Sequence, residues 1–506
     1  MIRPGGRADR LALLAALVLF LALALFGARW HWVEEAGTAE RDGYVAQAEQ
    51  IRAGTLPRDP FRPLLYPLLT AGLAFLTGDA FLAARLLSNL AAAALAWQCW
   101  AFGRRLAGPA VGGWAMALAA VNPNLWILGQ HVSTDMFFAA LAAGALLAGL
   151  CYLKEPRLGT ALAGGALLGL AAFTRSNAVF LLPALLAAWW LAPGDGDRRR
   201  RWTHLAAAAA LAVLVLLPHW ALRRAVFGDP FHDENWKNLA WKLHGYPDWS
   251  YLDRVPFSGG LAVVLDDPAA VVRGGLSEVV RFFFGGGAPQ LFGTWVHVLL
   301  LVAGAAVAVR RKPRLALWLL GACGLFFTAI AFAFFAWGRL LLLLIPPCYG
   351  LAFVPWERPR RVLNAVALAL VLLLAVKTFG FRLPDFIRRH PYREVAALRR
   401  LDASLPPGTA LAGTSPFLGR YLQRPYLDLP DAFGPEIAEP GLWFARIEPL
   451  VRRAGVGYLV VGATDLRDRP AALLDGDWGG GGGAPAPWLL PVSRQEGVAV
   501  WKINRP

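Results

Sequence analysis

Residues 11–28 read LALLAALVLFLALALFGA, an apolar run without a single charge, and this run decides the class of protein. An α-helix needs about 20 such residues to cross the roughly 30 Å hydrocarbon core of a bilayer. Similar runs recur along the 506-residue chain, which is 57% hydrophobic. We therefore expect an α-helical polytopic membrane protein. No convincing cleavage site precedes Arg29, so we interpret the run as a retained first helix, not a signal peptide.

The apolar runs predict eleven membrane-spanning helices. Another apolar segment, residues 64–78, is short and contains Pro67 and two glycines, so we expect a re-entrant or interfacial element there. The predicted spans are residues 11–28, 81–102, 110–129, 134–152, 160–174, 178–193, 203–222, 290–309, 315–336, 340–355 and 362–379.

The basic residues give these helices an orientation. If residues 64–78 do not cross, six connections lie on one side, and all are basic: residues 1–10, 103–109, 153–160, 193–202, 310–314 and 356–361. Cytoplasmic connections carry such an excess of Lys and Arg. The loops 29–80 and 223–289, and the tail from residue 381, then lie outside the inner (cytoplasmic) membrane.

Charge and cysteine content exclude two other kinds of site. The formal net charge is +16, but the arginines form short clusters between apolar runs and make no single basic face, so we expect no nucleic-acid partner. The four cysteines, Cys99, Cys151, Cys323 and Cys348, lie in or at the end of apolar runs without metal-ligand spacing. We interpret them as small buried hydrophobic residues.

The tail, residues 381–506, predicts a small α/β domain. Short strands are expected at 409–413, 424–428, 455–461 and 498–503, with a helix at 441–454. The glycine run 479–483 has no strand-to-helix context, so we interpret it as a loop and not as a phosphate cradle.

Carboxylates on the outer side are the first candidates for chemistry. Glu40 and Asp42 follow the first helix, and Asp135 ends the stretch GQHVSTD. A carboxylate at the interface can act as a general base on a hydroxyl or amine. Glu40 and Asp42 could instead belong to a solvated acidic loop, and Asp135 or its neighbours could cap the following helix.

Cations on the same side are the second candidates. Arg175 and Arg339 lie at the outer ends of helices, where they could bind an anionic headgroup or simply extend to the interface. The loop 223–289 is dense in Trp and Lys, which suits an interfacial amphipathic helix or stacking against sugars.

The order of these segments resembles GT-C superfamily glycosyltransferases of the family 39 type, which includes protein O-mannosyltransferases and lipid A aminoarabinose transferases. Five segments carry the resemblance: Asp42-x-Tyr44-x-x-x-Ala48, Arg62-Pro-Leu-Leu-Tyr66, His131-Val-Ser-Thr-Asp135, GALLGLAAFTR at 165–175, and Gly338-Arg339 with Pro346 downstream. The resemblance implies a GT-C transmembrane domain, residues 1–380, followed by an extracytoplasmic domain, residues 381–506.

The resemblance also implies an activity. Family members transfer a sugar from a polyprenyl-phosphate donor, with inversion, to a lipid, glycan or protein acceptor of the cell envelope. Asp42 would be the catalytic carboxylate, but many members carry an adjacent Asp-Glu pair before the tyrosine, so Glu40 stays an alternative. Arg62 would contact the lipid phosphate, and Tyr66, His131, Asp135, Arg175 and Arg339 would complete the substrate site.

Three points stay open. No cofactor is certain, and the need for a divalent cation is undecided. A transporter or flippase of lipid-linked sugars is the alternative function, although no internal repeat is evident and the charges lie at one face, not midway across the membrane. A catalytically inactive assembly factor on the same scaffold would differ only in activity.

Overall fold

The protein is described by a computed structural model that covers residues 6–32, 43–59, 61–193, 198–244, 257–358, 360–389, 392–413, 422, 424–429, 440–462, 486–495 and 498–504. Two compact units share the chain. The first comprises Met1–Leu25 and Gln47–Asp385, and the second comprises Phe26–Ala46 and Phe386–Pro506. The described residues 26–32 and 43–46 therefore belong to the second unit, together with the tail.

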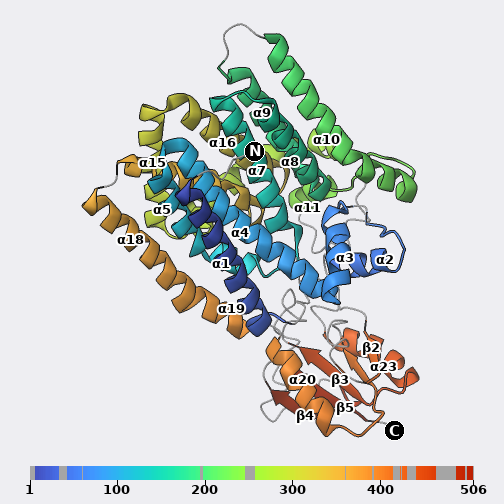
Figure 1. The fold of residues 1–506 in the computed structure, drawn as a ribbon. Coiled ribbons are helices and arrows are strands. Elements are labelled where there is room, and N and C mark those ends of the chain that lie inside the picture. Colours follow the sequence, from blue (N-terminus) through green and yellow to red (C-terminus); the bar gives the residue numbers. More distant parts are fainter. Residues whose placement is uncertain are drawn as a thin grey trace. The chain divides into compact units, whose positions relative to one another are not determined.

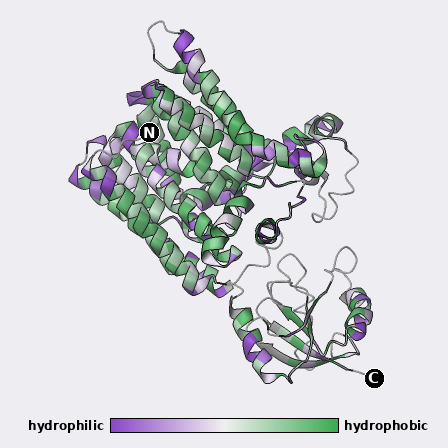
Figure 2. Cartoon of the chain, turned by 45° about the vertical axis from the view of Figure 1, so that its right-hand side comes forward, coloured by the Kyte–Doolittle hydropathy of each residue, from purple (hydrophilic) through white to green (hydrophobic). Residues whose placement is uncertain are grey.

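The first unit is a bundle of apolar helices (Figure 1). Hydrophobic residues run along these helices, and hydrophilic residues gather toward helix ends (Figure 2). Its main helices are α1 (Arg7–Trp30), α3 (Leu65–Thr77), α4 (Ala80–Ala107), α5 (Pro109–Ala120), α6 (Pro123–Leu128), α7 (Thr134–Lys154), α8 (Leu158–Thr174), η2 (Ser176–Leu181), α9 (Leu182–Leu191), α10 (Arg198–Phe227), α15 (Trp295–Arg311), α16 (Pro313–Ala333), η4 (Gly338–Leu344), α17 (Ile345–Ala352), η5 (Val354–Glu357), α18 (Arg361–Ala375) and η6 (Val376–Arg382).

Each predicted span corresponds to one or more helices. In the described part of the chain, six helices are long and apolar enough to cross a membrane: Arg7–Trp30, Ala80–Ala107, Thr134–Lys154, Arg198–Phe227, Pro313–Ala333 and Arg361–Arg388. The other expected spans correspond to the shorter helices α5, α8, α9, α15 and α17 with their short neighbours. The protein is thus a multi-pass membrane protein, and eleven crossings stay a prediction.

The expected single helix at 110–129 is wrong in detail, because it consists of α5 and α6. Pro123 lacks the N–H that a continuous helix requires and would clash with the preceding turn. Asn122 caps the new helix, since its side chain accepts a hydrogen bond from the Asn124 N–H at 2.8 Å. The Asn122 amide also donates to the Tyr349 hydroxyl at 2.7 Å, so the break is held within the bundle.

The segment 64–78 forms α3, a helix of 13 residues. Such a helix is about 20 Å long, too short to cross the hydrocarbon core. The helices on either side of it are antiparallel, because Asp9 at the start of α1 forms an ion pair with Arg104 near the end of α4. The chain between α1 and α4 therefore begins and ends at the same end of the bundle, as the interfacial interpretation requires.

The basic connections meet at the other end. Their side chains donate to carbonyl groups that end neighbouring helices, which satisfies acceptors without a helical partner. The contacts are Lys154 Nζ to Arg105 O at 2.6 Å, Lys312 Nζ to Leu106 O at 2.5 Å and to Glu357 Oε1 at 2.8 Å, and Arg314 Nη2 to Leu153 O at 2.7 Å. These clusters share one end of the bundle, as the predicted topology demands.

Small residues allow the helices to approach closely. A Cβ atom built on Gly165 of α8 would lie 2.2 Å from the carbonyl oxygen of Ala208 in α10. Membrane helices associate mainly through such close packing, since lipid gives them little hydrophobic driving force. Gly165 lies in the segment 165–175 that ends at Arg175, so this contact also sets the position of a predicted site residue.

The loop 223–289, called here the outer loop after its predicted side, contains four helices in its described part. These are α11 (Lys237–His244), α12 (Gly260–Asp266), α13 (Pro268–Phe284) and α14 (Gly287–Phe292). Another short helix, α2 (Tyr44–Arg52), precedes α3. Along α13 the residues Val272, Leu276, Val280 and Phe283 are exposed, whereas Gly275, Glu278 and Phe282 are buried. The buried face packs on α16, and the four exposed residues give α13 an apolar outer face.

The second unit contains a five-stranded sheet in the order β2-β1-β3-β5-β4. Its strands are β1 (Leu411–Gly413), β2 (Tyr426–Asp428), β3 (Tyr458–Gly462), β4 (Leu489–Gln495) and β5 (Val498–Ile503). The pairs β1–β2 and β1–β3 are parallel, and β3–β5 and β4–β5 are antiparallel. Its helices are α19 (Leu383–Arg389), which begins in the first unit, α20 (Tyr392–Ser404) and α23 (Pro440–Arg453).

This sheet buries both faces, because alternate residues of a strand point to opposite sides. Leu411 and Val460 pack with Val395 and Leu398 of α20. Ala412 and its register partner Leu459 instead pack with Trp443, Phe444, Ile447 and Val451 of α23. The small C-terminal α/β domain is therefore confirmed, with β4 as a strand that we did not predict; its extracytoplasmic location stays a prediction.

Candidate active site

Asp135 lies between two arginines. It is in the first turn of α7, its side chain is 8% exposed, and it forms an ion pair with Arg175. Arg339 approaches the same carboxylate, with its Nε 4.0 Å from Asp135 Oδ2. Three residues that are 40 or more positions apart in the chain thus meet at one carboxylate.

Each of the three occupies a helix boundary. Arg175 is the residue at which α8 ends, where its backbone is extended, and its Nη1 also donates to Thr134 Oγ1 at 3.4 Å. Arg339 is the second residue of η4. Ser133 precedes α7, but its side chain makes no capping hydrogen bond and instead donates to Asp135 Oδ2 at 3.3 Å. The Asp135 carboxylate is therefore directed at the arginines and not at its own helix.

The charges of the described residues at this cluster do not balance. Among these residues one carboxylate faces two guanidinium groups, and the Arg339 side chain is 40% exposed against 26% for Arg175. Arginine remains charged at any physiological pH and presents several N–H donors to oxygen anions. The cluster of Asp135, Arg175 and Arg339, called here the arginine site, can therefore accept an additional anion such as a phosphate.

Tyr66 and His131 belong to a buried hydrogen-bond network behind the arginine site. The Tyr66 hydroxyl donates to Ala84 O at 2.8 Å and lies 3.0 Å from Ser88 Oγ. Ser88 Oγ in turn donates to the backbone carbonyl of His131 at 2.8 Å. Tyr66 is fully buried, and His131 contributes its main chain here. The network joins α3, α4 and the loop that leads into Asp135, so it holds that loop.

Arg62 lies in a tight turn organised by Asp59. Asp59 Oδ1 accepts from the backbone N–H groups of Phe61 and Arg62 at 2.8 and 3.0 Å, and Arg62 Nη1 lies 3.1 Å from Asp59 Oδ2. Gln47 of α2 donates to the same oxygen at 2.7 Å. Four donors thus converge on the Asp59 carboxylate and fix Arg62 beside it.

Asn235 connects that turn to the arginine site. Its Nδ2 donates to Phe61 O at 2.5 Å and lies 3.3 Å from Ser176 Oγ. Phe61 precedes Arg62, and Ser176 follows Arg175. Asn235, a residue of the large outer loop, therefore contacts the chain neighbours of Arg62 and Arg175, two of the predicted phosphate ligands.

The predicted catalytic carboxylates, Glu40 and Asp42, lie outside the described residues. The next described residue is Gly43, whose φ of 67° favours glycine. Tyr44 follows it and is buried, with 4% of its surface exposed. Among the described residues no group of three or more His, Cys, Asp or Glu could hold a metal ion. A requirement for a divalent cation therefore stays undecided.

Sequence reasoning missed several residues of this region. Asp59, Ser88 and Asn235 act through hydrogen bonds to distant segments, and their local sequence carries no signal of this. Arg85 did carry a signal in the sequence, because it is a charge within an apolar helix. In the structure its side chain is buried, with 4% exposed.

Known proteins resemble this chain in part of its sequence and in its fold. Residues 61–221 match the family model described as dolichyl-phosphate-mannose-protein mannosyltransferase. The fold is similar to ArnT from Cupriavidus metallidurans in the apo state, with a TM-score of 0.55, 15% identity, and 97% and 98% of the two chains covered. The chain is therefore similar to GT-C glycosyltransferases in part of its sequence and in its fold.

Two further solved structures share this GT-C fold. The same ArnT bound to undecaprenyl phosphate has a TM-score of 0.53 and 16% identity, with 97% of each chain covered. The oligosaccharyltransferase of Archaeoglobus fulgidus has a TM-score of 0.51 and 12% identity, with 89% of this chain and 68% of that chain covered. No curated protein sequence matches the chain significantly. The predicted resemblance to GT-C membrane glycosyltransferases is confirmed for the fold and for residues 61–221.

Proposed function

We propose that this protein is an inverting glycosyltransferase that transfers a sugar from a polyprenyl-phosphate donor to a lipid, glycan or protein acceptor of the cell envelope. The observation that carries the proposal is the arginine site. Asp135 holds Arg175 and Arg339 together and neutralises only one of them. An oxygen anion of the donor phosphate supplies the missing negative charge.

The residues divide the reaction between them. Arg339 and Arg175 bind the phosphate, and Arg62 contacts it from the turn that Asn235 joins to Ser176. As the bond between the sugar C1 and the phosphate oxygen breaks, negative charge grows on that oxygen, and fixed cations stabilise it. No strong general acid is needed, because polyprenyl phosphate is already a good leaving group.

The acceptor is activated on the opposite side of the sugar. Asp42, with Glu40 as the alternative, removes the proton of the acceptor hydroxyl or amine. At the same time the acceptor oxygen or nitrogen forms its bond to C1 of the sugar. One displacement inverts the configuration, and no second carboxylate is required as a nucleophile.

The carrier and the membrane face are also part of the proposal. The bound undecaprenyl phosphate in the ArnT structure supports a polyprenyl-phosphate donor. The basic connections at one end of the bundle support a cytoplasmic location for that end, and hence an outer face of the inner membrane for the arginine site.

Sugar transfer in proteoliposomes tests the proposal. The wild-type protein is supplied with a panel of labelled polyprenyl-phosphate sugars and envelope extract, and is compared with Asp42→Asn, Glu40→Gln and Arg339→Gln. Glu155→Gln is the matched control, because Glu155 is 60% exposed at the basic end. We expect transfer by wild type and control, and loss in Arg339→Gln and in one carboxylate variant.

The carboxylate that abolishes transfer identifies the base. If the wild-type protein neither transfers nor hydrolyses any donor but moves lipid-linked sugar across the bilayer, the transporter alternative replaces the transferase.

A further inference from the structure

The position of Arg339 depends on a short non-helical segment before it. Helix α16 ends at Ala333, and η4 begins at Gly338. Between them Phe334 is extended, and the chain turns at Trp337, whose N–H donates to Phe335 O at 2.8 Å. Any movement of this turn moves Arg339, which follows it by two residues.

A carboxylate from the outer loop holds this turn. Glu278 of α13 accepts a hydrogen bond from the backbone N–H of Ala336 at 2.7 Å and forms an ion pair with Arg281. The Glu278 side chain is 11% exposed, and Ala336 is buried. A charged acceptor strengthens such a bond, and a buried N–H without it would be costly.

A lysine of the same loop fastens the end of α16. Lys242 of α11 donates to the carbonyl of Ala331, in the last turn of that helix. Burial lowers the pKa of Lys242 to about 8, although the nearby Glu278 carboxylate opposes this shift and Arg281 adds to it. Two outer-loop helices thus hold the chain on both sides of the turn.

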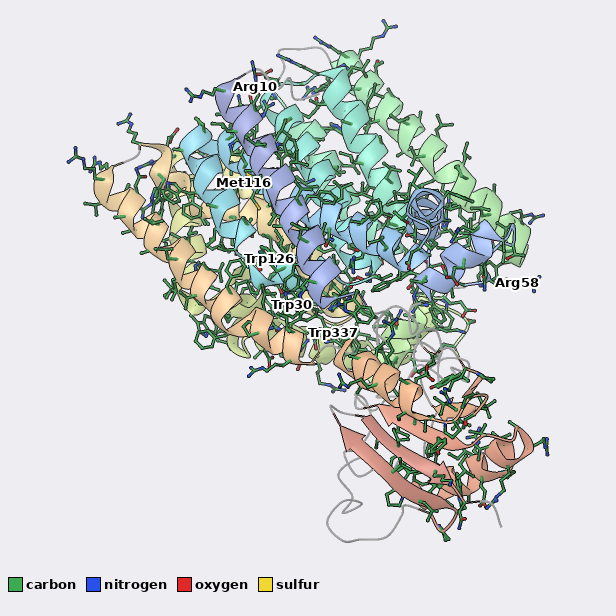
Figure 3. The ribbon with its side chains drawn as sticks, turned by 60° about the horizontal axis from the view of Figure 1, so that its bottom comes forward. Arg10, Trp30, Arg58, Met116, Trp126 and Trp337 are labelled. Atoms are coloured by element: carbon green, nitrogen blue, oxygen red, sulfur yellow. The ribbon has the colours of Figure 1, made fainter. Side chains whose placement is uncertain are left out.

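Aromatic rings continue the support to the guanidinium. Trp241 of α11 meets Phe335 edge-on at 5.4 Å, and Phe335 stacks on Trp337 at 4.9 Å. The Arg339 guanidinium carbon lies 5.0 Å from the centre of the Trp337 ring, within the range of a cation–π contact. Figure 3 shows Trp337 at the end of the bundle opposite Arg10.

Asp135 alone does not fix this guanidinium. The separation of 4.0 Å between Arg339 Nε and Asp135 Oδ2 is an ion-pair distance and too long for a hydrogen bond. The orientation of Arg339 therefore rests on Trp337 and on the turn that Glu278 holds.

We infer that Glu278 is a positioning residue, which sets Arg339 for binding of the donor phosphate through the Ala336 N–H. The inference rests on the proposed function, because it needs Arg339 to bind the phosphate. It assigns a role to α13, whose other face carries the exposed Val272, Leu276, Val280 and Phe283. The outer loop then contributes to donor affinity without touching the donor.

Binding of undecaprenyl phosphate by the purified full-length protein, together with the donor KM and kcat of transfer, tests this. Glu278→Ala should weaken binding and raise donor KM by about tenfold, with a smaller change in kcat. Glu278→Gln keeps an oxygen for the Ala336 N–H and should stay within about threefold of wild type. Arg273→Gln is the control on the same helix, since Arg273 is 74% exposed.

A double-mutant cycle separates positioning from general damage. If Glu278 acts through Arg339, Glu278→Ala adds little to the loss already caused by Arg339→Gln. Fully additive losses would overturn the inference while leaving Arg339 as a phosphate ligand. Undiminished binding in Arg339→Gln would instead overturn the proposed function.

A second variant covers the case in which Glu278→Ala does not fold. Trp337→Leu removes the cation–π contact but leaves the Glu278–Ala336 bond, and it should also raise donor KM. Unchanged donor binding in Trp337→Leu would contradict the positioning of Arg339 through this turn.

Discussion

Asp135 and Arg175 form an ion pair that joins the start of α7 to the end of α8. The carboxylate is almost fully buried, whereas a quarter of the Arg175 side chain is exposed. The pair therefore does two things. It fastens two helices at one end of the bundle, and it places Arg175 beside Arg339, where both cations face the same anion.

Replacement of Asp135 by Asn should separate these roles. Loss of the carboxylate leaves Arg175 without its counter-ion and lets its guanidinium move. We expect the rate of transfer to fall by about a hundredfold, the usual effect of a misplaced binding group. Because Arg175 retains solvent contact, we expect a stability loss of only about 1–2 kcal/mol. Transfer assays and thermal unfolding in detergent measure the two effects. Asp135→Asn/Arg175→Gln should be less destabilised than the sum of the single variants.

Ser88→Ala tests the network behind the arginine site. The change removes the donor to His131 O and the partner of the Tyr66 hydroxyl, at a cost of about 1 kcal/mol for each bond lost. Transfer should fall and donor affinity should weaken, since Ser88 holds the loop before Asp135, which orients the phosphate-binding arginines. Ser88→Thr, which retains the hydroxyl, is the comparison. Equal activity in both variants would show that the hydroxyl is dispensable.

Gly165→Ala tests the packing of α8 on α10. A Cβ atom there would meet Ala208 O at 2.2 Å, so the helices must separate, at a cost of about 1–3 kcal/mol. Gly159 is the matched control on the same helix, because a Cβ atom there has nothing within 4 Å. Gly159→Ala should be neutral or stabilising by up to about 1 kcal/mol. Unfolding in detergent measures both, and similar stability would contradict the packing argument.

Lys242 predicts a pH dependence of stability. Its pKa is about 8 in the folded protein, below the ordinary value of 10.5. Between these two values the unfolded chain binds the proton and the folded protein does not, so stability rises with pH. The melting temperature of the wild-type protein should therefore increase relative to Lys242→Met as the pH is raised from 8 to 10. A constant difference would mean that Lys242 titrates normally.

Trp32 tests the second unit. It packs against the cluster formed by Val395, Leu398, Leu411 and Val460, and Arg399 lies 5.1 Å from its ring. Trp32→Ala should cost this unit about 3 kcal/mol, the low end for a large buried aromatic residue, because Trp32 is only partly buried. Trp32→Phe should retain most of the stability. Protection of α20 from limited proteolysis measures the difference between the two variants.

The positions of helices and strands could largely be predicted from sequence, because hydrophobic run length and period are local properties. The breaks inside the predicted spans 110–129 and 340–355 were missed, although Pro123 and Pro346 lie in them. Strand β4 was missed as well, since Pro491 interrupts its pattern and its pairing with β5 contains an irregularity there. Asp135, Arg175 and Arg339 were candidates for the site because each charge adjoins an apolar helix, and Arg62 was a candidate because of the family resemblance.

By itself, the sequence determined that this chain is a membrane protein and predicted its resemblance to GT-C glycosyltransferases, because apolar run length, the placement of basic clusters and the order of short motifs are all contained in it. Only the tertiary structure decided which charges meet. The contacts of Asp135 with Arg339, of Glu278 with Ala336, and of Asn235 with both Phe61 and Ser176 join segments far apart in the chain. Such pairings depend on how the helices pack, and no local pattern records them. In sequence, Glu278 and Arg281 resemble an ordinary surface pair, and burial against α16 makes Glu278 a support for the site.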